Sequence, residues 1–314
     1  MYETIAFLIT APAVLILWFS LSKMPHVGTI KKVVVVNDCG YVWEDLKPYL
    51  PQNVKWQFIT RNRSLWGKTF GIFFKILFSK GDFYIANFAL QDAWLVQKLK
   101  HLDLLICHGG DVRWTIKKKR LGWMVRSNLK AARQVAFTVD DLEETMRKFR
   151  PDAFFLHRPI QIEKYVPDKH SHSKLSAVYF EKPYDKLNFE LVDLLNRNNC
   201  TLTVVARDPA ATDINATGKD SFVPHRNMPA FLRNFDVFVD HMAYDGSVSK
   251  LCLEAMSCGL CTITWRDKNR LPERVQELLN PDARRKEGVE NRRFVEENHN
   301  AATVAVTVQK AFTH

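Results

Sequence analysis

Short apolar runs alternate with longer amphipathic stretches along most of the chain. Four valines follow Lys32, and comparable runs lie at residues 83–88, 102–108, 134–139 and 153–157. Short runs rich in β-branched residues indicate buried strands, and the stretches between them have a helical period. Strands that alternate with helices predict a parallel sheet covered on both faces. We therefore predict an α/β chain whose first Rossmann-like domain spans residues 31–166.

A second series of the same kind begins after a polar stretch at residues 167–173, which is typical of a linker. A second Rossmann-like domain is therefore expected at residues 174–290, followed by one or two helices at 291–314. Its strands are expected at 176–180, 201–206, 235–240 and 261–265, with a helix at 187–196.

The amino-terminal segment is apolar in a different way, because residues 4–22 contain no charged side chain. A helix of this length spans about 28 Å, close to the hydrocarbon thickness of a bilayer. We expect residues 1–24 to form a membrane anchor helix. Lys23, Lys31 and Lys32 follow it, which predicts that the body of the protein lies on the cytoplasmic side. A cleaved signal peptide and a helix of a soluble domain are the alternatives.

Composition narrows the class of partner without selecting one. The chain has 45 Lys and Arg against 34 Asp and Glu, a net charge of +11, which favours an anionic partner such as a membrane surface, a nucleotide or a nucleic acid. No recognisable nucleic-acid module is present, so a nucleic acid is not the expected partner. Six scattered cysteines in 314 residues are typical of a reducing compartment rather than of a disulfide framework.

Residues 229–264 carry the most chemistry. An expected helix leads into the strand 235–240, then into a loop with Asp245, Gly246, Ser247 and Val248, and then into an apolar helix with one carboxylate, Glu254. A glycine-containing loop and a helix N-terminus at the carboxyl end of a strand favour phosphate and sugar hydroxyls. We therefore expect a donor-binding site there.

This segment resembles the donor-binding half of the GT-B glycosyltransferases, glycosyltransferase family 4 in particular, in which LEAM-x-CG-x-P commonly follows an acidic, glycine-rich loop. The sequence ICHGGDVR at residues 106–113 is similar to the HG-x-D segment of the same family. The resemblance implies the GT-B fold, with two Rossmann-like domains facing across a cleft, here preceded by the N-terminal hydrophobic helix. It also implies that the last helix packs back on the N-terminal domain.

The resemblance further implies roles for single residues. Glu254 would hold the ribose of the nucleotide, and His108, with Asp111 nearby, would contact the donor sugar. Backbone N–H groups of residues 246–248 would bind sugar hydroxyls. Lys182 and Lys186 are expected to supply the two cations that hold the diphosphate, and Arg207 is another candidate. Asp38 and Gly40 are assigned to the acceptor loop.

The implied activity is transfer of a sugar, with retention, from a nucleotide-diphosphate sugar. Because the expected N-terminal span tethers the chain to a membrane, a lipid-linked or glycan acceptor at that membrane is favoured. The resemblance implies no cofactor besides the donor substrate, and since the chain contains no Asp-x-Asp triplet, no metal is expected. Two departures from the family leave alternatives open. The first acid of the donor loop is displaced or absent, since Gly246 stands eight positions before Glu254, and the arginine of the basic pair is lost. A catalytically inactive sugar-nucleotide binder or membrane scaffold, a sugar-nucleotide epimerase and a nucleic-acid-binding protein are the alternatives.

Overall fold

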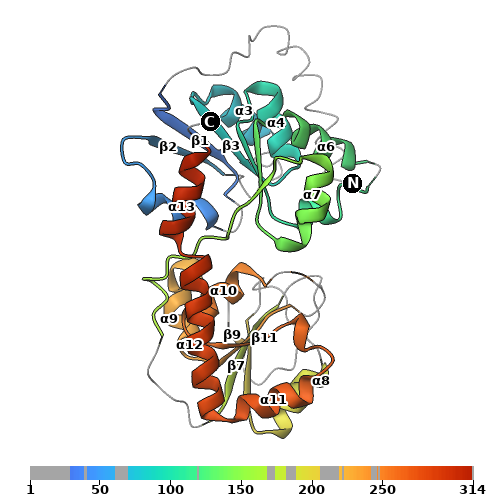
Figure 1. Cartoon of the computed structure of the whole chain (residues 1–314), viewed down its shortest axis with the longest axis vertical. Coiled ribbons are helices and arrows are strands. Elements are labelled where there is room, and N and C mark those ends of the chain that lie inside the picture. Colours follow the sequence, from blue (N-terminus) through green and yellow to red (C-terminus); the bar gives the residue numbers. More distant parts are fainter. Residues whose placement is uncertain are drawn as a thin grey trace. The chain divides into compact units, whose positions relative to one another are not determined.

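The structure is a computed structural model that describes residues 29–38, 41–60, 70–118, 120–167, 174–181, 189–205, 219–220, 223–241, 246 and 248–312 (Figure 1). The anchor helix expected at residues 1–24 lies outside the described residues. Within the described segments, no helix has the length and apolar character needed to span a bilayer.

The chain divides into two compact units. Unit 1 comprises residues 1–157 and 304–314, and unit 2 comprises residues 158–303. The polypeptide therefore passes from one unit to the other twice, near residue 157 and again near residue 303. Each unit has its own sheet and its own cores, as parallel α/β layers require.

Unit 1 contains a parallel sheet whose strand order, among the described residues, is β2-β1-β3-β4-β5-β6. Every pairing in it is parallel. The strands are β1 (Lys32–Val36), β2 (Lys55–Ile59), β3 (Phe83–Asn87), β4 (Leu104–Cys107), β5 (Gln134–Phe137) and β6 (Phe154–Phe155). The helices are α2 (Val42–Leu46), α3 (Ile72–Phe78), α4 (Gln91–Leu99), α5 (Gly110–Arg113), α6 (Gly122–Ala131), α7 (Glu143–Phe149) and α13 (Ala301–Lys310).

Strand β1 shows why both faces of this sheet are covered. Val34 and Val36 pack into a core with α3, α4, α6 and α7, while Val33 and Val35 pack into a second core with α2 and α13. Successive side chains of a strand point to opposite faces, so four consecutive valines need apolar cover on both. Helix α13 supplies part of the second cover through Val304, Ala305 and Val308.

Unit 2 contains a second parallel sheet with the order β11-β10-β7-β8-β9 among its described residues. Its strands are β7 (Ser176–Phe180), β8 (Thr201–Val205), β9 (Lys219–Asp220), β10 (Val237–Val239) and β11 (Cys261–Ile263). Its helices are α8 (Phe189–Arg197), α9 (Met228–Leu232), α10 (Lys250–Ser257), α11 (Leu271–Leu279) and α12 (Pro281–Asn298).

Helices α10 and α12 approach closely because glycine stands at their contact. A Cβ on Gly288 would lie 2.2 Å from the carbonyl oxygen of Gly259. Gly259 follows α10 with φ of 80°, the left-handed conformation that commonly ends a helix at glycine. Both residues are therefore required to be glycine by the backbone geometry rather than by chemistry at a site.

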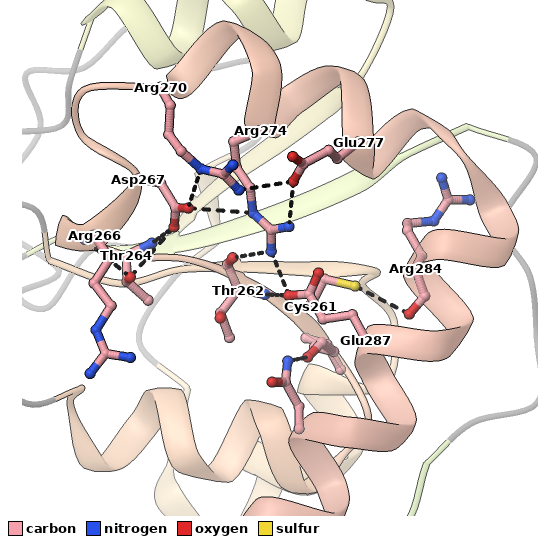
Figure 2. A network of polar contacts seen from close by, with 12 residues as sticks. Cys261, Thr262, Thr264, Arg266, Asp267, Arg270, Arg274, Glu277, Arg284 and Glu287 are labelled. Carbon is pink, nitrogen blue, oxygen red and sulfur yellow. Dashed lines mark hydrogen bonds and ion pairs between the residues drawn. The ribbon is translucent and has the colours of Figure 1, made fainter.

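A polar network ties β11, α11 and α12 together (Figure 2). Arg274 donates to the carbonyl oxygen of Thr262 at 2.7 Å and forms an ion pair with Glu287. Glu287 in turn accepts from the backbone N–H of Thr262 at 3.1 Å. The short η6 helix (Trp265–Asp267) joins the network because Asp267 lies 3.7 Å from Arg274 and caps the helix together with Thr264. The network fixes the end of β11.

Candidate functional site

In unit 2, hydrogen bonds fix the start of helix α10 relative to the end of strand β10. Ser249 is its N-cap, and the Ser249 side chain accepts a hydrogen bond from the backbone N–H of Cys252 at 3.1 Å. Asp240 follows β10, is buried, and accepts from the backbone N–H of Ser249 at 2.7 Å. An N-cap of this kind satisfies one of the free N–H groups of the first turn. The bond between Ser249 and Asp240 thereby connects the N-terminus of the helix to the end of the strand.

Glu254 lies inside α10 and is only 3% exposed. Its carboxylate oxygen Oε1 is 3.1 Å from Nε2 of His225 and 3.7 Å from Nζ of Lys250. The hydroxyl of Tyr165 lies 3.4 Å from the same nitrogen of His225. Burial of a lone carboxylate is costly, so these polar partners are what stabilise a negative charge at this depth. The site is a buried carboxylate flanked by an imidazole and an ammonium group.

The loop before α10 is described at two of its four candidate positions. Gly246 lies in a bend, and the carbonyl oxygen of Val248 accepts a hydrogen bond from Arg158. Asp245 and Ser247 lie outside the described residues, as do the cations expected at the diphosphate, Lys182, Lys186 and Arg207. Among the described residues, Arg158 is a cation that contacts this loop, and no sequence motif marks it.

In unit 1, His108 directly follows β4, and its imidazole ring is held by side chains from the two neighbouring strands. Nδ1 lies 3.2 Å from the hydroxyl of Thr138, after β5, and Nε2 lies 3.4 Å from Oδ1 of Asn87, at the end of β3. The indole N–H of Trp43 donates to the same Oδ1 at 3.2 Å, which fixes the orientation of the amide. An amide oxygen only accepts, so the contact with Asn87 is a hydrogen bond in the tautomer that carries its proton on Nε2.

Asp111 lies beside His108 in sequence, but its carboxylate is turned toward the backbone. It is fully buried, and it accepts hydrogen bonds from the backbone N–H groups of Ala89 (2.8 Å), His108 (3.1 Å) and Gly109 (3.0 Å). Burial raises the pKa of Asp111, while the bonds from Ala89 and His108 act in the opposite direction. These contacts give Asp111 a positioning role, because they hold the loops after β3 and β4 together.

Asp38 also points at the backbone. Its two oxygens accept from the backbone N–H groups of Trp43 and Glu44, each at 3.0 Å, which places the carboxylate at the first turn of α2. A carboxylate there is favoured by the helix dipole. Gly40, the other residue expected in the acceptor loop, lies outside the described residues.

Several side chains of the site are not marked by any sequence motif, and four of them show what signal the sequence holds: Asn87, Thr138, His225 and Asp240. Asn87 and Asp240 stand at the carboxyl ends of buried strands, where a polar residue after an apolar run is the available signal. Thr138 stands just after β5 in the same way. His225 lies in the short η5 helix (His225–Asn227), far from Glu254 in sequence, and no motif marks it.

No protein-family model and no curated protein matches the sequence. Among solved structures, HepE from Anabaena in complex with UDP and glucose is similar, with a TM-score of 0.67 at 11% identity over 91% of this chain and 100% of HepE.

Two further solved structures are similar over about the same share of this chain. An alpha-glucosyltransferase in complex with UDP and a DNA 13-mer has a TM-score of 0.60 at 10% identity, over 91% of this chain and 100% of that protein. A protein described as a UDP-N-acetylglucosamine 2-epimerase, from Listeria monocytogenes, has a TM-score of 0.59 at 11% identity, over 90% of this chain and 96% of that protein. With its parallel α/β units, this chain has the fold of the GT-B glycosyltransferases.

Proposed function

We propose that the protein is a glycosyltransferase that moves a sugar from a nucleotide-diphosphate sugar to a membrane-associated acceptor, either lipid-linked or a glycan. The observation that carries this proposal is the buried carboxylate of Glu254 in the helix after β10, in a chain with this fold. A carboxylate at that place can accept hydrogen bonds from ribose hydroxyls. HepE, which has the same fold, binds UDP and UDP-glucose in its crystal structures.

The proposed reaction proceeds with retention and without a metal. Breaking the bond between the anomeric carbon and the diphosphate builds negative charge on the leaving phosphate, which cations and backbone N–H groups stabilise. We assign that role to Lys182, Lys186 and Arg207, and we assign Gly246, Val248 and their neighbours to the sugar hydroxyls. Lys250, 3.7 Å from Glu254, is a further cation on the same helix.

The membrane part of the proposal has support from the surface of unit 1. On α3, Phe74 and Phe78 are 48% and 75% exposed and stack on each other at 6.1 Å, with Lys75 between them in sequence. Trp114 and Trp123 are also exposed. Aromatic rings beside basic residues favour the headgroup region of anionic membranes. We propose that residues 1–24 anchor the protein and that its body lies on the cytoplasmic side.

The donor half of the proposal is tested by titrating the protein with UDP-, GDP- and ADP-sugars. We expect one of these to bind to the wild type and to bind at least tenfold more weakly to Glu254→Gln, which removes the charge and keeps the size. Glu273→Gln, an exposed glutamate of α11, is the control and should bind as the wild type does. Absence of binding to all nucleotide sugars would refute the proposal. Tight binding without turnover, with any acceptor, would instead identify an inactive binder.

The acceptor half is tested with vesicles. The full chain should bind anionic vesicles and transfer sugar to a lipid extract, and a chain without residues 1–24 should do both less well. Phe74→Ser together with Phe78→Ser should reduce vesicle binding further. Turnover that is unchanged by a chelator and a product with the anomeric configuration of the donor would support the metal-free, retaining mechanism. A truncated chain that keeps full activity on water-soluble acceptors and no preference for lipids would remove the membrane from the proposal.

A further inference from the structure

Strained backbone conformations cluster in the loops at the carboxyl ends of the unit 1 strands. Among the described residues, the non-glycine residues with positive φ are Asn37 (61°), Tyr41 (57°), Phe88 (81°) and Asn199 (55°). All except Asn199 lie in the loops that follow β1 and β3, which are neighbours in the sheet. Gly109, in the loop after β4, has φ of 111°. Residues held in such conformations cluster at sites where their placement serves function.

Phe88 is the most unusual of these residues. Asparagine tolerates the left-handed region, but a bulky aromatic residue rarely adopts it. Phe88 is also a member of neither core of unit 1, although it is half-buried. Its conformation is therefore not explained by a need to fill the interior with its ring.

Hydrogen bonds on each side force the conformation of this loop. The backbone N–H of Phe88 donates to Ile106 at 2.8 Å, and its carbonyl accepts from Leu90 at 2.8 Å. The next residue, Ala89, donates to the buried Asp111, while the side-chain amide of Asn128 donates to the carbonyls of Ala89 and Leu90 at 3.1 and 3.0 Å. Two buried side chains from other elements thus hold a strained aromatic residue in place.

The ring of Phe88 lies next to the loop that contains His108. A Cβ on Gly110 would stand 4.0 Å from the Cζ atom of Phe88, so the tip of the ring reaches this glycine. The residue before it, Asn87, accepts from His108 and Trp43, and its buried amide nitrogen has no hydrogen-bond partner among the described residues. An aromatic face, an imidazole and an unused amide donor therefore lie together at the carboxyl ends of β3 and β4.

We propose that Phe88 is a substrate-contacting residue whose ring packs against the C–H face of a pyranose bound beside His108. The inference rests on the proposed function and deepens it by naming the surface that recognises the sugar. A pyranose has an apolar face of ring hydrogens and an equatorial belt of hydroxyls, so it is matched by one aromatic ring with polar groups at its edge. The clamp on the loop holds the ring in position before the sugar arrives.

The test distinguishes the effect of the Phe88 ring from the effect of its strained backbone conformation. Glycine adopts φ of 81° without cost, so Phe88→Gly relieves the strain and removes the ring, whereas Phe88→Ala removes the ring alone. We expect Phe88→Gly to be at least as heat-stable as Phe88→Ala, to bind UDP as the wild type does and to bind UDP-glucose at least tenfold more weakly. Phe88→Tyr should retain binding. Phe149→Ala, which removes an exposed ring of α7, and Asn199→Gly, which relieves strain in unit 2, are the matched controls.

Free sugars distinguish failure of this inference from failure of the proposed function. Saturation-transfer NMR with methyl glucoside and N-acetylglucosamine should show contact with the wild type and none with Phe88→Gly. If UDP-sugars do not bind but this difference persists, the proposed function is wrong and the sugar contact stands. The inference is overturned if the wild type binds no saccharide, or if Phe88→Gly binds UDP-glucose as tightly as the wild type.

Discussion

Replacing Asp111 with asparagine tests the arrangement that holds the loops of unit 1. The buried carboxylate accepts three backbone hydrogen bonds, two on Oδ1 and one on Oδ2. In Asp111→Asn one oxygen becomes an NH2 group that faces an N–H donor. One or two of the three bonds then lose their acceptor, and those that remain lose the charge.

The magnitude follows from these contacts. A hydrogen bond to a charged group contributes about 1.5–3 kcal/mol, against about 0.5–1.5 for a neutral one, and a buried donor left without an acceptor costs about 1–3 kcal/mol. Removing the charge also removes the desolvation penalty that raises the pKa of Asp111. We expect a net loss of about 2–3 kcal/mol, which for a unit of this size corresponds to a fall in Tm of about 5–10 °C.

Urea unfolding followed by tryptophan fluorescence is a suitable assay, because Trp265 is the single tryptophan of the eight that belongs to unit 2. The signal therefore reports mainly on unit 1. Asp141→Asn is the control, since Asp141 forms a partly exposed ion pair with Arg113 that should contribute under about 1 kcal/mol. If Asp111→Asn leaves the urea midpoint unchanged, the carboxyl group is protonated in the folded protein and the ionic account of this clamp is wrong.

Four further predictions concern unit 2. Burial raises the pKa of the Cys258 and Cys261 thiols to about 12, so neither should react with iodoacetamide at pH 8 in the folded protein, as measured by mass spectrometry, while both react in urea. Because these pKa values are raised on folding, their contribution to stability is present below pH 9 and should be lost as the pH rises from about 9 toward 12. In an exposed helix a glycine-to-alanine substitution stabilises the protein by about 1 kcal/mol. In Gly288→Ala the added Cβ meets the backbone of Gly259, so we expect the free energy of unfolding to fall by about 1–3 kcal/mol, as measured by thermal unfolding. A stabilised variant would contradict the close contact. Arg274→Lys keeps the charge but cannot reach Thr262 and Glu287 together, and should cost about 1–3 kcal/mol with faster hydrogen exchange in α11, whereas the exposed Arg270→Lys should change little.

The sequence predicts most of the architecture because the buried strands are apolar runs. The four valines of β1 and the segments that become β3, β4, β5, β6, β7, β8, β10 and β11 are found this way. The edge strands β2 and β9 are not. In β2, Lys55 to Ile59 are mixed and mostly half-buried, and β9 has two residues, so neither has the pattern of a central strand.

The sequence predicts some residues of the candidate site and not their partners. Glu254 is noticeable because a single carboxylate interrupts an apolar helix, and His108 because it follows a buried strand. The partners of these residues, His225 and Asn87, come from elements distant in sequence, and only tertiary packing brings them within reach. Sequence spacing also does not show the direction of a side chain. The carboxylates of Asp38 and Asp111 both bind backbone N–H groups, which the motif alone does not reveal.

The path of the chain through the two units affects how the protein is made. Helix α13 covers one face of the unit 1 sheet, yet it is translated after all of unit 2. The part of that face which α13 covers is therefore exposed while the ribosome is still synthesising the rest of the protein, and exposed apolar surface of this kind recruits chaperones. A premature stop before residue 304 would leave this part exposed in every finished molecule, so aggregation is the expected fate of such a product.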